Sequence, residues 1–395
     1  MKAIINPRPL AGTVPAIASK SMAHRLIIAA ALANDPTHVV CNTTCADIEA
    51  TVRCLTALGA KIEATEDGFS VRPAPRSVEF GLLKALHGGT LDCGESGSTL
   101  RFMLPVACAL GAEASFIGAG RLGSRPLAPL SDEIIAAGCD LDGLGGFPLK
   151  TSGRMRAGRF VLPGNVSSQY ISGLLLSFPL LDGASDINLT IQAMKEFGVE
   201  VTVRHADATS TQPESTTFSV NARGYRSPGT VQVEGDWSNA AFWLCAGALS
   251  NAPIAVEGVS LNSAQGDRNV MAALSRFGAR IQRAPKCATA QPDALNGFEM
   301  SAQDIPDLVP VISAVASCAQ GTTVIRDCAR LRIKESDRLA TTASELNALG
   351  AHVEVDGDNL IIHGTTELNG GTVDSHNDHR IAMMAAVATS RCNSQ

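Results

Sequence analysis

Residues 19–33 read SKSMAHRLIIAAALA, and this stretch decides the fold because the chain repeats its design. A polar loop runs directly into an apolar helical stretch in five further places: CGESGSTLRFMLPVACAL (93–110), PGNVSSQYISGLLLSF (163–178), EGDWSNAAFWLCAGAL (234–249), QDIPDLVPVISAVASCA (303–319) and SHNDHRIAMMAAVAT (375–389). Equivalent positions are Arg25, Arg101, Tyr170, Ala240, Leu308 and Arg380, and successive ones lie about 70 residues apart. This regular spacing indicates six copies of one supersecondary unit.

A second signal recurs between these copies. Stretches such as LTALGAKIE and LNALGAHVEV end a helix pattern at a glycine and then alternate like a strand. These glycines are Gly59, Gly138, Gly198, Gly278 and Gly350. Glycine just past a helix end adopts the left-handed conformation without steric cost. Each unit is therefore predicted to contain a helix, a crossing strand, a second helix and a strand pair. That is too large for a solenoid repeat and fits a βαβ-type module.

Six such units in 395 residues predict an α/β fold with two similar domains of three repeats each. Crossovers between the domains are expected at Pro15 and within YRSPGTVQVEGD (225–236). The first domain would span residues 14–232, and the second would combine residues 1–13 with 233–395. The sixth unit is expected to be incomplete, because only one helix precedes Gln395. A ligand site between the two halves is the default expectation for this layout.

The composition of the chain argues against several classes of protein. The net charge of −6 argues against nucleic acid as a partner, because binding a phosphate backbone usually needs a basic surface. Neither a signal peptide nor a membrane span is expected, because no apolar stretch is long enough. The 11 cysteines include no CxxC pair and no zinc-type cluster, which favours free thiols in a reducing compartment. A cytoplasmic protein, or one imported after loss of a transit peptide, is therefore expected.

Polar residues stand directly before the first predicted helix of every repeat. There, unpaired N–H groups and a partial positive charge favour anions. Ordinary helix capping explains such residues equally well at any single loop. The loops also carry cations that a cap does not need, among them Lys20, Arg25, Arg125 and Arg380. Arginine matches phosphate and carboxylate groups through paired hydrogen bonds, so the loops predict binding of small anions.

The stretch LRIKESDRLA (331–340) has the densest charge pattern. In a helix, Lys334 and Arg338 would share a face, which is unfavourable unless an anion or a carboxylate lies between them. The alternative is a solvated face with an ion pair between Glu335 and Arg338. Walker, Rossmann, GxSxG and metal-site motifs are absent from the sequence, so anion chemistry without a cofactor or metal is expected. His24 and His379 are candidates for acid–base groups, but a capping or supporting role is favoured.

Taken together, the loops resemble the successive motifs of the 5-enolpyruvylshikimate-3-phosphate (EPSP) synthase family. The motifs are SKSMAHR, CGESGSTLR, RLGSRPL, GNVSSQY, YRSPGTVQVEGDWS, IPDLVP, LRIKESDRL and NDHRIAM, in order from Pro15 to Arg391. The SKS loop, KESDR and NDHR together are highly specific, whereas GESGST alone would be weak. The resemblance implies two domains of three βαβαββ units each. It also implies transfer of the enolpyruvyl group of phosphoenolpyruvate to the 5-hydroxyl of shikimate 3-phosphate, by a monomer of the chorismate pathway.

The resemblance also assigns residues one at a time. Positions that match shikimate 3-phosphate contacts are Lys20, Ser21, Arg25, Ser167, Ser168, Gln169, Asp307 and Lys334. Positions that match the phosphoenolpyruvate pocket are Lys20, Gly97, Arg125, Gln169, Arg338 and Arg380. Catalysis is expected from Asp307, which would accept the proton of the shikimate hydroxyl, from Glu335, which would protonate the methylene carbon, and from Lys20.

Two departures from the family pattern keep alternatives open. The family has a strand and an S-x-P-Y-I-D segment after the SSQ helix, but here LLDGASD (180–186) runs directly into INLTIQAMKEFG (187–198). The family's final segment, with a lysine that contacts phosphoenolpyruvate, would lie beyond Gln395. A truncated or non-catalytic anion-binding relative is therefore one alternative. An enolpyruvyl transferase acting on UDP-N-acetylglucosamine is less favoured, because its cysteine-bearing loop is not apparent whereas KESDR is.

Overall fold

The computed structural model describes residues 2–8, 10–79, 82–85, 88–163, 168–181, 185–186, 191–206, 215–220 and 224–394. The chain forms two compact units, each with its own hydrophobic core. Unit 1 comprises Met1–Ile17 and Glu234–Gln395, and unit 2 comprises Ala18–Val233. No helix among the described residues is long and apolar enough to cross a membrane.

The helices and strands of unit 2 alternate as the repeat requires. Its helices are α1 (Lys20–Ala31), α2 (Ala46–Ala57), α3 (Gly97–Ala109), α4 (Leu130–Ala136), α5 (Ser168–Ser177) and α6 (Ile191–Glu196). Its strands are β2 (Thr37–Val40), β3 (Lys61–Thr65), β4 (Gly68–Arg72), β5 (Arg76–Glu79), β6 (Leu82–Ala85), β7 (Gly89–Asp92), β8 (Ala114–Ile117), β9 (Cys139–Asp142), β10 (Leu149–Gly153), β11 (Ser185–Asp186), β12 (Val201–Ala206), β13 (Ser215–Val220) and β14 (Thr230–Gln232).

Unit 1 follows the same alternation. Its helices are α7 (Trp237–Leu249), α8 (Val270–Phe277), α9 (Val309–Ala316), α10 (Arg338–Ala348) and α11 (His379–Ala388). Its strands are β1 (Gly12–Pro15), β15 (Ile254–Glu257), β16 (Arg280–Ala284), β17 (Cys287–Gln291), β18 (Glu299–Ser301), β19 (Thr322–Arg326), β20 (His352–Asp356) and β21 (Asn359–His363). Short 3₁₀ turns include η4 (Pro306–Leu308), before α9, and η5 (Ala329–Ile333), before α10.

Four sheets share one strand order. They are β14-β2-β4-β3 and β7-β8-β10-β9 in unit 2, and β1-β15-β17-β16 and β18-β19-β21-β20 in unit 1. In each, the first two strands pair in parallel and the remaining pairs are antiparallel. β1 precedes α1 in the chain but pairs with β15 of unit 1, and β14 precedes α7 but pairs with β2 of unit 2. The two units therefore exchange one edge strand each where the chain passes between them.

The third repeat differs from these four. Its sheet, β11-β13-β12, has antiparallel pairs, and β11 is only two residues long. The expectation that residues 180–186 run into the next helix without a strand is therefore wrong. Ser185 and Asp186 pair with the backbone of β13, whose edge would otherwise leave its N–H and C=O groups unpaired. Residues 187–190, which match the end of the family segment, lie outside the described part of the chain.

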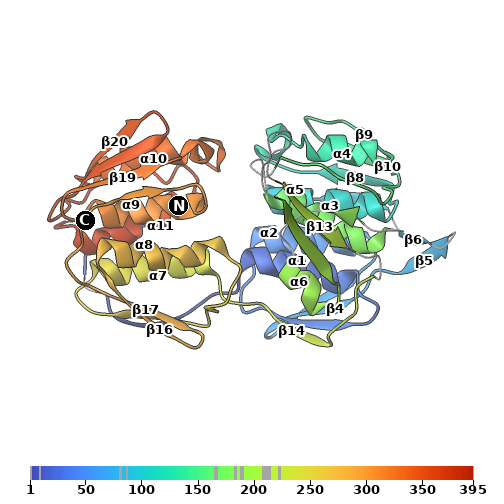
Figure 1. The fold of residues 1–395 in the computed structure, drawn as a ribbon, viewed down its shortest axis with the longest axis horizontal. Coiled ribbons are helices and arrows are strands. Elements are labelled where there is room, and N and C mark those ends of the chain that lie inside the picture. The colour runs from blue at the N-terminus through green and yellow to red at the C-terminus, as the bar shows by residue number, and fades with distance from the viewer. Residues whose placement is uncertain are drawn as a thin grey trace. The chain divides into compact units, whose positions relative to one another are not determined.

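The first helix of each repeat lies inside its unit, with the sheets around the outside (Figure 1). Every residue of α9 is buried, and every residue of α3 is buried except Ser98 and Arg101. The inner helices contact one another, α1 with α3 and α5 in unit 2, and α7 with α9 and α11 in unit 1. A helix that is apolar on all sides can be stable only in such a core, so the long apolar runs of the sequence become the centre of each unit.

The second helix of each repeat ends as predicted. Gly59, Gly138, Gly198, Gly278 and Gly350 all have positive φ, at 101°, 104°, 71°, 111° and 93°. Glycine lets the chain leave the helix in the left-handed conformation and turn into the following strand. At Gly278 space is limiting too, because a Cβ there would lie 2.5 Å from the carbonyl oxygen of Ala294.

We expect Gly278→Ala to lower the free energy of unfolding more than Gly12→Ala does. Both glycines have nearly the same φ, at 111° and 115°, but a Cβ at Gly12 would meet no atom within 4 Å. Gly12→Ala should cost about 1–2 kcal/mol for the left-handed backbone. Gly278→Ala should cost about 1–3 kcal/mol more for the clash. Urea unfolding of both variants measures the difference, and equal losses would contradict the close approach.

Candidate active site

The three inner helices of unit 1 begin close together and carry the charged residues of the site in or beside their first turns. Asp236 caps α7 by accepting a hydrogen bond from the Asn239 N–H (2.8 Å), and Asp378 caps α11 by accepting one from the Arg380 N–H (2.9 Å). Asp307 lies in η4, which leads into α9. The Nη1 of Arg380 donates to the backbone carbonyl of Asp307 (2.9 Å) and thereby joins two of these helix starts.

Arg338, the first residue of α10, lies at the centre of this group. Its side chain is 1% exposed and is surrounded by carboxylates. Its Nε and Nη2 donate to Asp378 at 2.7 and 3.2 Å, its Nη1 donates to Asp307 at 2.8 Å, and its Nη2 also donates to Glu335 at 2.5 Å. The side chain of Asp378 is fully buried. A buried charge is very unfavourable unless it is paired and hydrogen-bonded, so these carboxylates are what allow Arg338 to lie inside the protein.

Asp307 lies between three cations. Its carboxylate is 3.1 Å from Lys334 Nζ, 2.8 Å from Arg338 Nη1 and 3.6 Å from Arg380 Nη2. Burial would raise the pKa of Asp307, but the charges of Arg380, Lys334 and Arg338 together hold this pKa well below its usual value. Asp307 is therefore ionised at neutral pH. The structure brings together five of the predicted positions here: Asp307, Lys334, Glu335, Arg338 and Arg380.

Lys334 and Arg338 do not share a helix, so the condition under which they would lie on one helix face is not met. Lys334 has an extended backbone after η5, and α10 begins only at Arg338. Asp337 sets this starting point, because its side chain caps the N-terminus of α10 by accepting a hydrogen bond from the Ala340 N–H (3.2 Å). The two cations still meet, since both contact the same oxygen, Oδ1 of Asp307. A carboxylate does lie between them, as the pattern required, and the alternative ion pair between Glu335 and Arg338 is also present.

In unit 2, the start of α1 carries the first predicted loop. Ser19 caps the helix, and Lys20 Nζ lies 2.9 Å from a carboxylate oxygen of Asp47, at the start of α2. Arg25 donates to the Ser21 carbonyl (2.6 Å) and to Ser172 Oγ of α5 (2.7 Å). Its guanidinium also lies 4.9 Å from the centre of the Phe102 ring. Burial lowers the pKa of Arg25 to about 10, which leaves it charged at neutral pH.

A second group of cations in unit 2 surrounds Gly97, the first residue of α3. A Cβ at Gly97 would lie 3.0 Å from Nη1 of both Arg101 and Arg125, so the two guanidinium groups approach the same helix start. Arg101 Nη1 donates to Gln169 Oε1 (2.6 Å), and Gln169 Nε2 donates to Ser98 Oγ (2.8 Å). The predicted positions Gly97, Arg125 and Gln169 are thus joined through Arg101.

Arg101 was not among the predicted site residues, although a signal for it was present. It lies four residues after Gly97, which places both on one face of a helix, and it interrupts an otherwise apolar run. Asp378 was also missed, because nothing in the sequence indicates that its partner is Arg338. Of the remaining predicted positions, Ser21 and Ser168 are exposed at the starts of α1 and α5, and Ser167 lies outside the described residues.

His24 has a supporting place in unit 2. It is completely buried, and its Nδ1 lies 2.7 Å from Thr51 Oγ1, which in turn lies 2.8 Å from Thr99 Oγ1. Burial, with the nearby charge of Lys20, lowers the pKa of His24 to about 3, so the ring is neutral at physiological pH. This chain of side chains links the three helices α1, α2 and α3. The supporting role favoured from the sequence fits this geometry better than proton transfer to a substrate.

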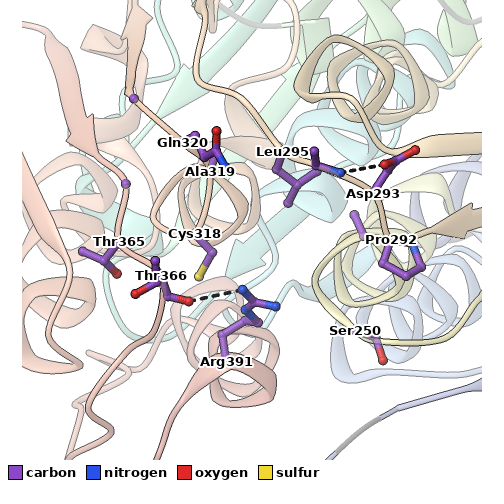
Figure 2. Close-up of a pocket in the computed structure, with 14 residues that line it drawn as sticks. Ser250, Pro292, Asp293, Leu295, Cys318, Ala319, Gln320, Thr365, Thr366 and Arg391 are labelled. Atoms are coloured by element: carbon purple, nitrogen blue, oxygen red, sulfur yellow. Dashed lines mark hydrogen bonds between the residues drawn. The ribbon is translucent and has the colours of Figure 1, made fainter.

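A cavity of about 400 Å³ in unit 1 lies away from these groups (Figure 2). It is lined by residues at the C-terminal ends of the inner helices, such as Ser250 after α7, Cys318 after α9 and Arg391 after α11. A 13-residue helix such as α7 is about 20 Å long, so the cavity is remote from Asp307. Arg391 donates to the Thr366 carbonyl (3.2 Å), and Asp293 is paired with Arg280, so its charged groups are already engaged.

Repeated α/β units whose inner helices begin at clustered cations are typical of proteins that bind small phosphorylated or carboxylated anions. The family model described as EPSP synthase (3-phosphoshikimate 1-carboxyvinyltransferase) matches residues 4–395. The chain belongs to this family.

Individual relatives agree with the family match. The 3-phosphoshikimate 1-carboxyvinyltransferase of Clostridium beijerinckii is 39% identical over 98% of this chain and 90% of the relative. That of Clostridioides difficile is 38% identical over 98% of this chain and 91% of the relative. The solved EPSP synthase of Acinetobacter baumannii has a TM-score of 0.81 at 25% identity, over 99% of this chain and 92% of that one. These long matches do not favour the truncated, non-catalytic alternative.

We expect Asp378→Asn to destabilise unit 1 strongly. The change removes the one fully buried carboxylate that binds Arg338 and leaves only the partly exposed Asp307 and Glu335 as its countercharges. Loss of such charge-assisted hydrogen bonds typically costs about 1.5–3 kcal/mol. Glu299→Gln is the matched control, because Glu299 makes an equally direct pair with Arg326, at 2.5 and 3.0 Å, that is more than half exposed. Solvent screening makes such a pair weak, so little change is expected there. Urea unfolding compares the two, and similar losses would show that burial of Arg338 does not depend on Asp378.

Proposed function

We propose that this chain transfers the enolpyruvyl group of phosphoenolpyruvate to the 5-hydroxyl of shikimate 3-phosphate and releases phosphate. The observation that carries the proposal is the Asp307 group. An ionised carboxylate lies among three cations, and Glu335 shares one of those cations, Arg338. Attack of a hydroxyl on C2 of phosphoenolpyruvate needs a proton acceptor, and C3 needs a proton donor. Clustered cations stabilise the phosphate that departs.

Asp307 is the proposed proton acceptor, and its surroundings explain how it could become one. Its pKa is depressed by cations, and such a carboxylate is a weak base. An anionic substrate bound to Arg338, Arg380 or Lys334 would cancel much of this positive charge. The pKa of Asp307 would then rise towards the range where it can take a proton. Substrate binding would therefore activate the base.

Glu335 is the proposed proton donor. It is 42% exposed and accepts a hydrogen bond from Arg338 Nη2 at 2.5 Å. A carboxylate of phosphoenolpyruvate that took over this Nη2 group would displace Glu335, and Glu335 would then be available to carry a proton to the methylene carbon. Arg338 and Arg380 are accordingly assigned to phosphoenolpyruvate, and Lys334 to the shikimate hydroxyl side.

Unit 2 supplies the remaining proposed contacts. Gly97, Arg125 and Gln169 are assigned to phosphoenolpyruvate, and Arg101 joins them because it contacts Gln169 and approaches Gly97. Lys20 is assigned to both substrates. The positions assigned to shikimate 3-phosphate are Ser21, Arg25, Ser168 and Gln169, together with Ser167. Among the residues described, no carboxylate is within ion-pair distance of Arg25, Arg101 or Arg125, which supports their assignment to anionic ligands.

The proposal also covers the oligomeric state, the compartment and the partners of the enzyme. We propose a monomer that acts in the cytoplasm and has no nucleic-acid partner, and the net charge of −6 supports the last point. Size-exclusion chromatography with light scattering tests the oligomeric state.

We expect phosphate release with phosphoenolpyruvate plus shikimate 3-phosphate, and none when UDP-N-acetylglucosamine replaces shikimate 3-phosphate. Asp307→Asn and Glu335→Gln should each lower kcat by about 10²–10⁴-fold, because each removes one proton-transfer group. Glu299→Gln, whose ion pair is exposed, should leave kcat unchanged. Release with the nucleotide sugar, or folded Asp307→Asn with normal kcat, would contradict the assignment.

A further inference from the structure

The loop that enters α11 has an unusual backbone directly before the site. His376 and Asn377 both have left-handed φ, at 51° and 57°, and neither is glycine. Such a conformation costs about 1–2 kcal/mol per residue for non-glycine residues, and it persists only where surrounding contacts impose it. The next residue is Asp378, which holds Arg338, and Arg380 follows two residues later. The conformation of this turn therefore sets where two site residues lie.

Glu345 holds this turn from α10. Its Oε2 accepts a hydrogen bond from the Asp374 N–H (2.8 Å), and its Oε1 lies 2.9 Å from Nε2 of His376. Asp374 in turn accepts a hydrogen bond from the His376 N–H (2.8 Å). The side chain of Glu345 is 8% exposed, so its carboxylate depends on these donors for its stability.

Glu345 and Arg338 belong to the same helix. Glu345 lies about two turns after Arg338, so the two side chains leave α10 on the same side. Arg338 binds Asp378 after the left-handed turn, and Glu345 binds Asp374 and His376 before and within it. α10 therefore holds the turn at both ends, which explains why the strained backbone is retained.

We propose that Glu345 and His376 are positioning residues of the enolpyruvyl transfer. They hold the left-handed turn so that Asp378 reaches Arg338 and Arg380 reaches Asp307. The proposal rests on the function proposed above, because it concerns the anion pocket of that reaction. Neither residue contacts Arg380 or Asp307 through any bond found among the described residues, so they act through the turn.

The positive charge of protonated His376 strengthens its contact with Glu345. The hydrogen bond with Glu345 and the charges of Asp374 and Glu345 raise the pKa of His376 above 6.5. Glu345 on α10 and Asp374 on its own loop are the charged groups that act on the imidazole. Because the pKa is raised by folding, the added stability is fully present below the ordinary histidine pKa and is lost as pH rises through the raised one.

Glu345→Gln and His376→Gln test the proposal. Each should raise KM for phosphoenolpyruvate roughly tenfold, about the effect of one lost charge-assisted hydrogen bond, and should change kcat less than about threefold. The double variant should be little worse than either single one, because both remove the same contact. A merely structural role would instead lower the melting temperature and the active fraction, and leave KM unchanged. KM values within twofold of wild type in folded variants would overturn the proposal.

The same unit offers a matched control. His363 and Glu354 form a second histidine–glutamate pair, but its atoms are 4.0 Å apart and the side chains are 49% and 70% exposed. Glu354→Gln and His363→Gln should leave KM unchanged. The ratio of KM in His376→Gln to KM in wild type should fall as pH rises through the raised pKa of His376, whereas the ratio for His363→Gln should stay flat. If the ratio for His376→Gln does not change with pH, the charge of His376 does not contribute to holding the turn.

Hydrogen–deuterium exchange separates failure of this proposal from failure of the proposed function. If wild type showed no transfer activity, the function would be wrong, but the turn could still be examined. Glu345→Gln should speed amide exchange in residues 374–381, which include the first turn of α11, and Glu354→Gln should not. Unchanged exchange there would overturn the positioning role whatever the activity.

Discussion

The burial of one guanidinium, that of Arg338, determines how unit 1 is organised around its site. A cation that is 1% exposed must be neutralised from every side, and Arg338 is bound by Asp307 before α9, by Glu335 and by Asp378 before α11. Two segments far apart in the chain, η4 and the loop before α11, are thereby fixed to the start of α10. The inner helices bring their N-termini close, and Arg338 sets how their first turns meet.

This arrangement couples binding to chemistry. Three cations, Lys334, Arg338 and Arg380, are paired with three carboxylates, Asp307, Glu335 and Asp378. An anionic substrate must compete with these carboxylates for the cations. The carboxylates that lose a partner are the two assigned to proton transfer, whereas Asp378 is fully buried and keeps its bond. Under the proposed function, electrostatic competition would therefore make Asp307 and Glu335 ready for proton transfer when a substrate occupies the site.

The sequence was sufficient to predict the repeated helices and turns, but not the contacts between residues that are distant in the chain. The six loop–helix copies and the five glycines are local patterns, and positive φ at all five glycines confirmed the helix ends. A helix face shared by Lys334 and Arg338 does not form, because Asp337 caps the N-terminus of α10 and the helix begins only at Arg338. The pairing of Arg338 with Asp378, and of Glu345 with His376, depends on how helices pack, which no local pattern encodes. Arg101 had a signal in its spacing from Gly97, but its link to Gln169 appears only in the fold.

The two units treat their cations differently, and this difference bears on their roles. In unit 1 the site cations are paired with carboxylates. In unit 2, Lys20 pairs with Asp47, but the arginines differ. Arg25 lies over Phe102 and donates to Ser172, and Arg101 lies over Tyr170 and donates to Gln169. Aromatic rings, hydroxyls and amides orient a guanidinium without cancelling its charge. These two arginines of unit 2 therefore retain positive charge suited to attracting and holding anions, whereas the site cations of unit 1 are in balanced pairs that an anion must rearrange. Under the function proposed above, unit 2 would contribute mainly affinity, and unit 1 would contribute the proton transfers assigned to Asp307 and Glu335.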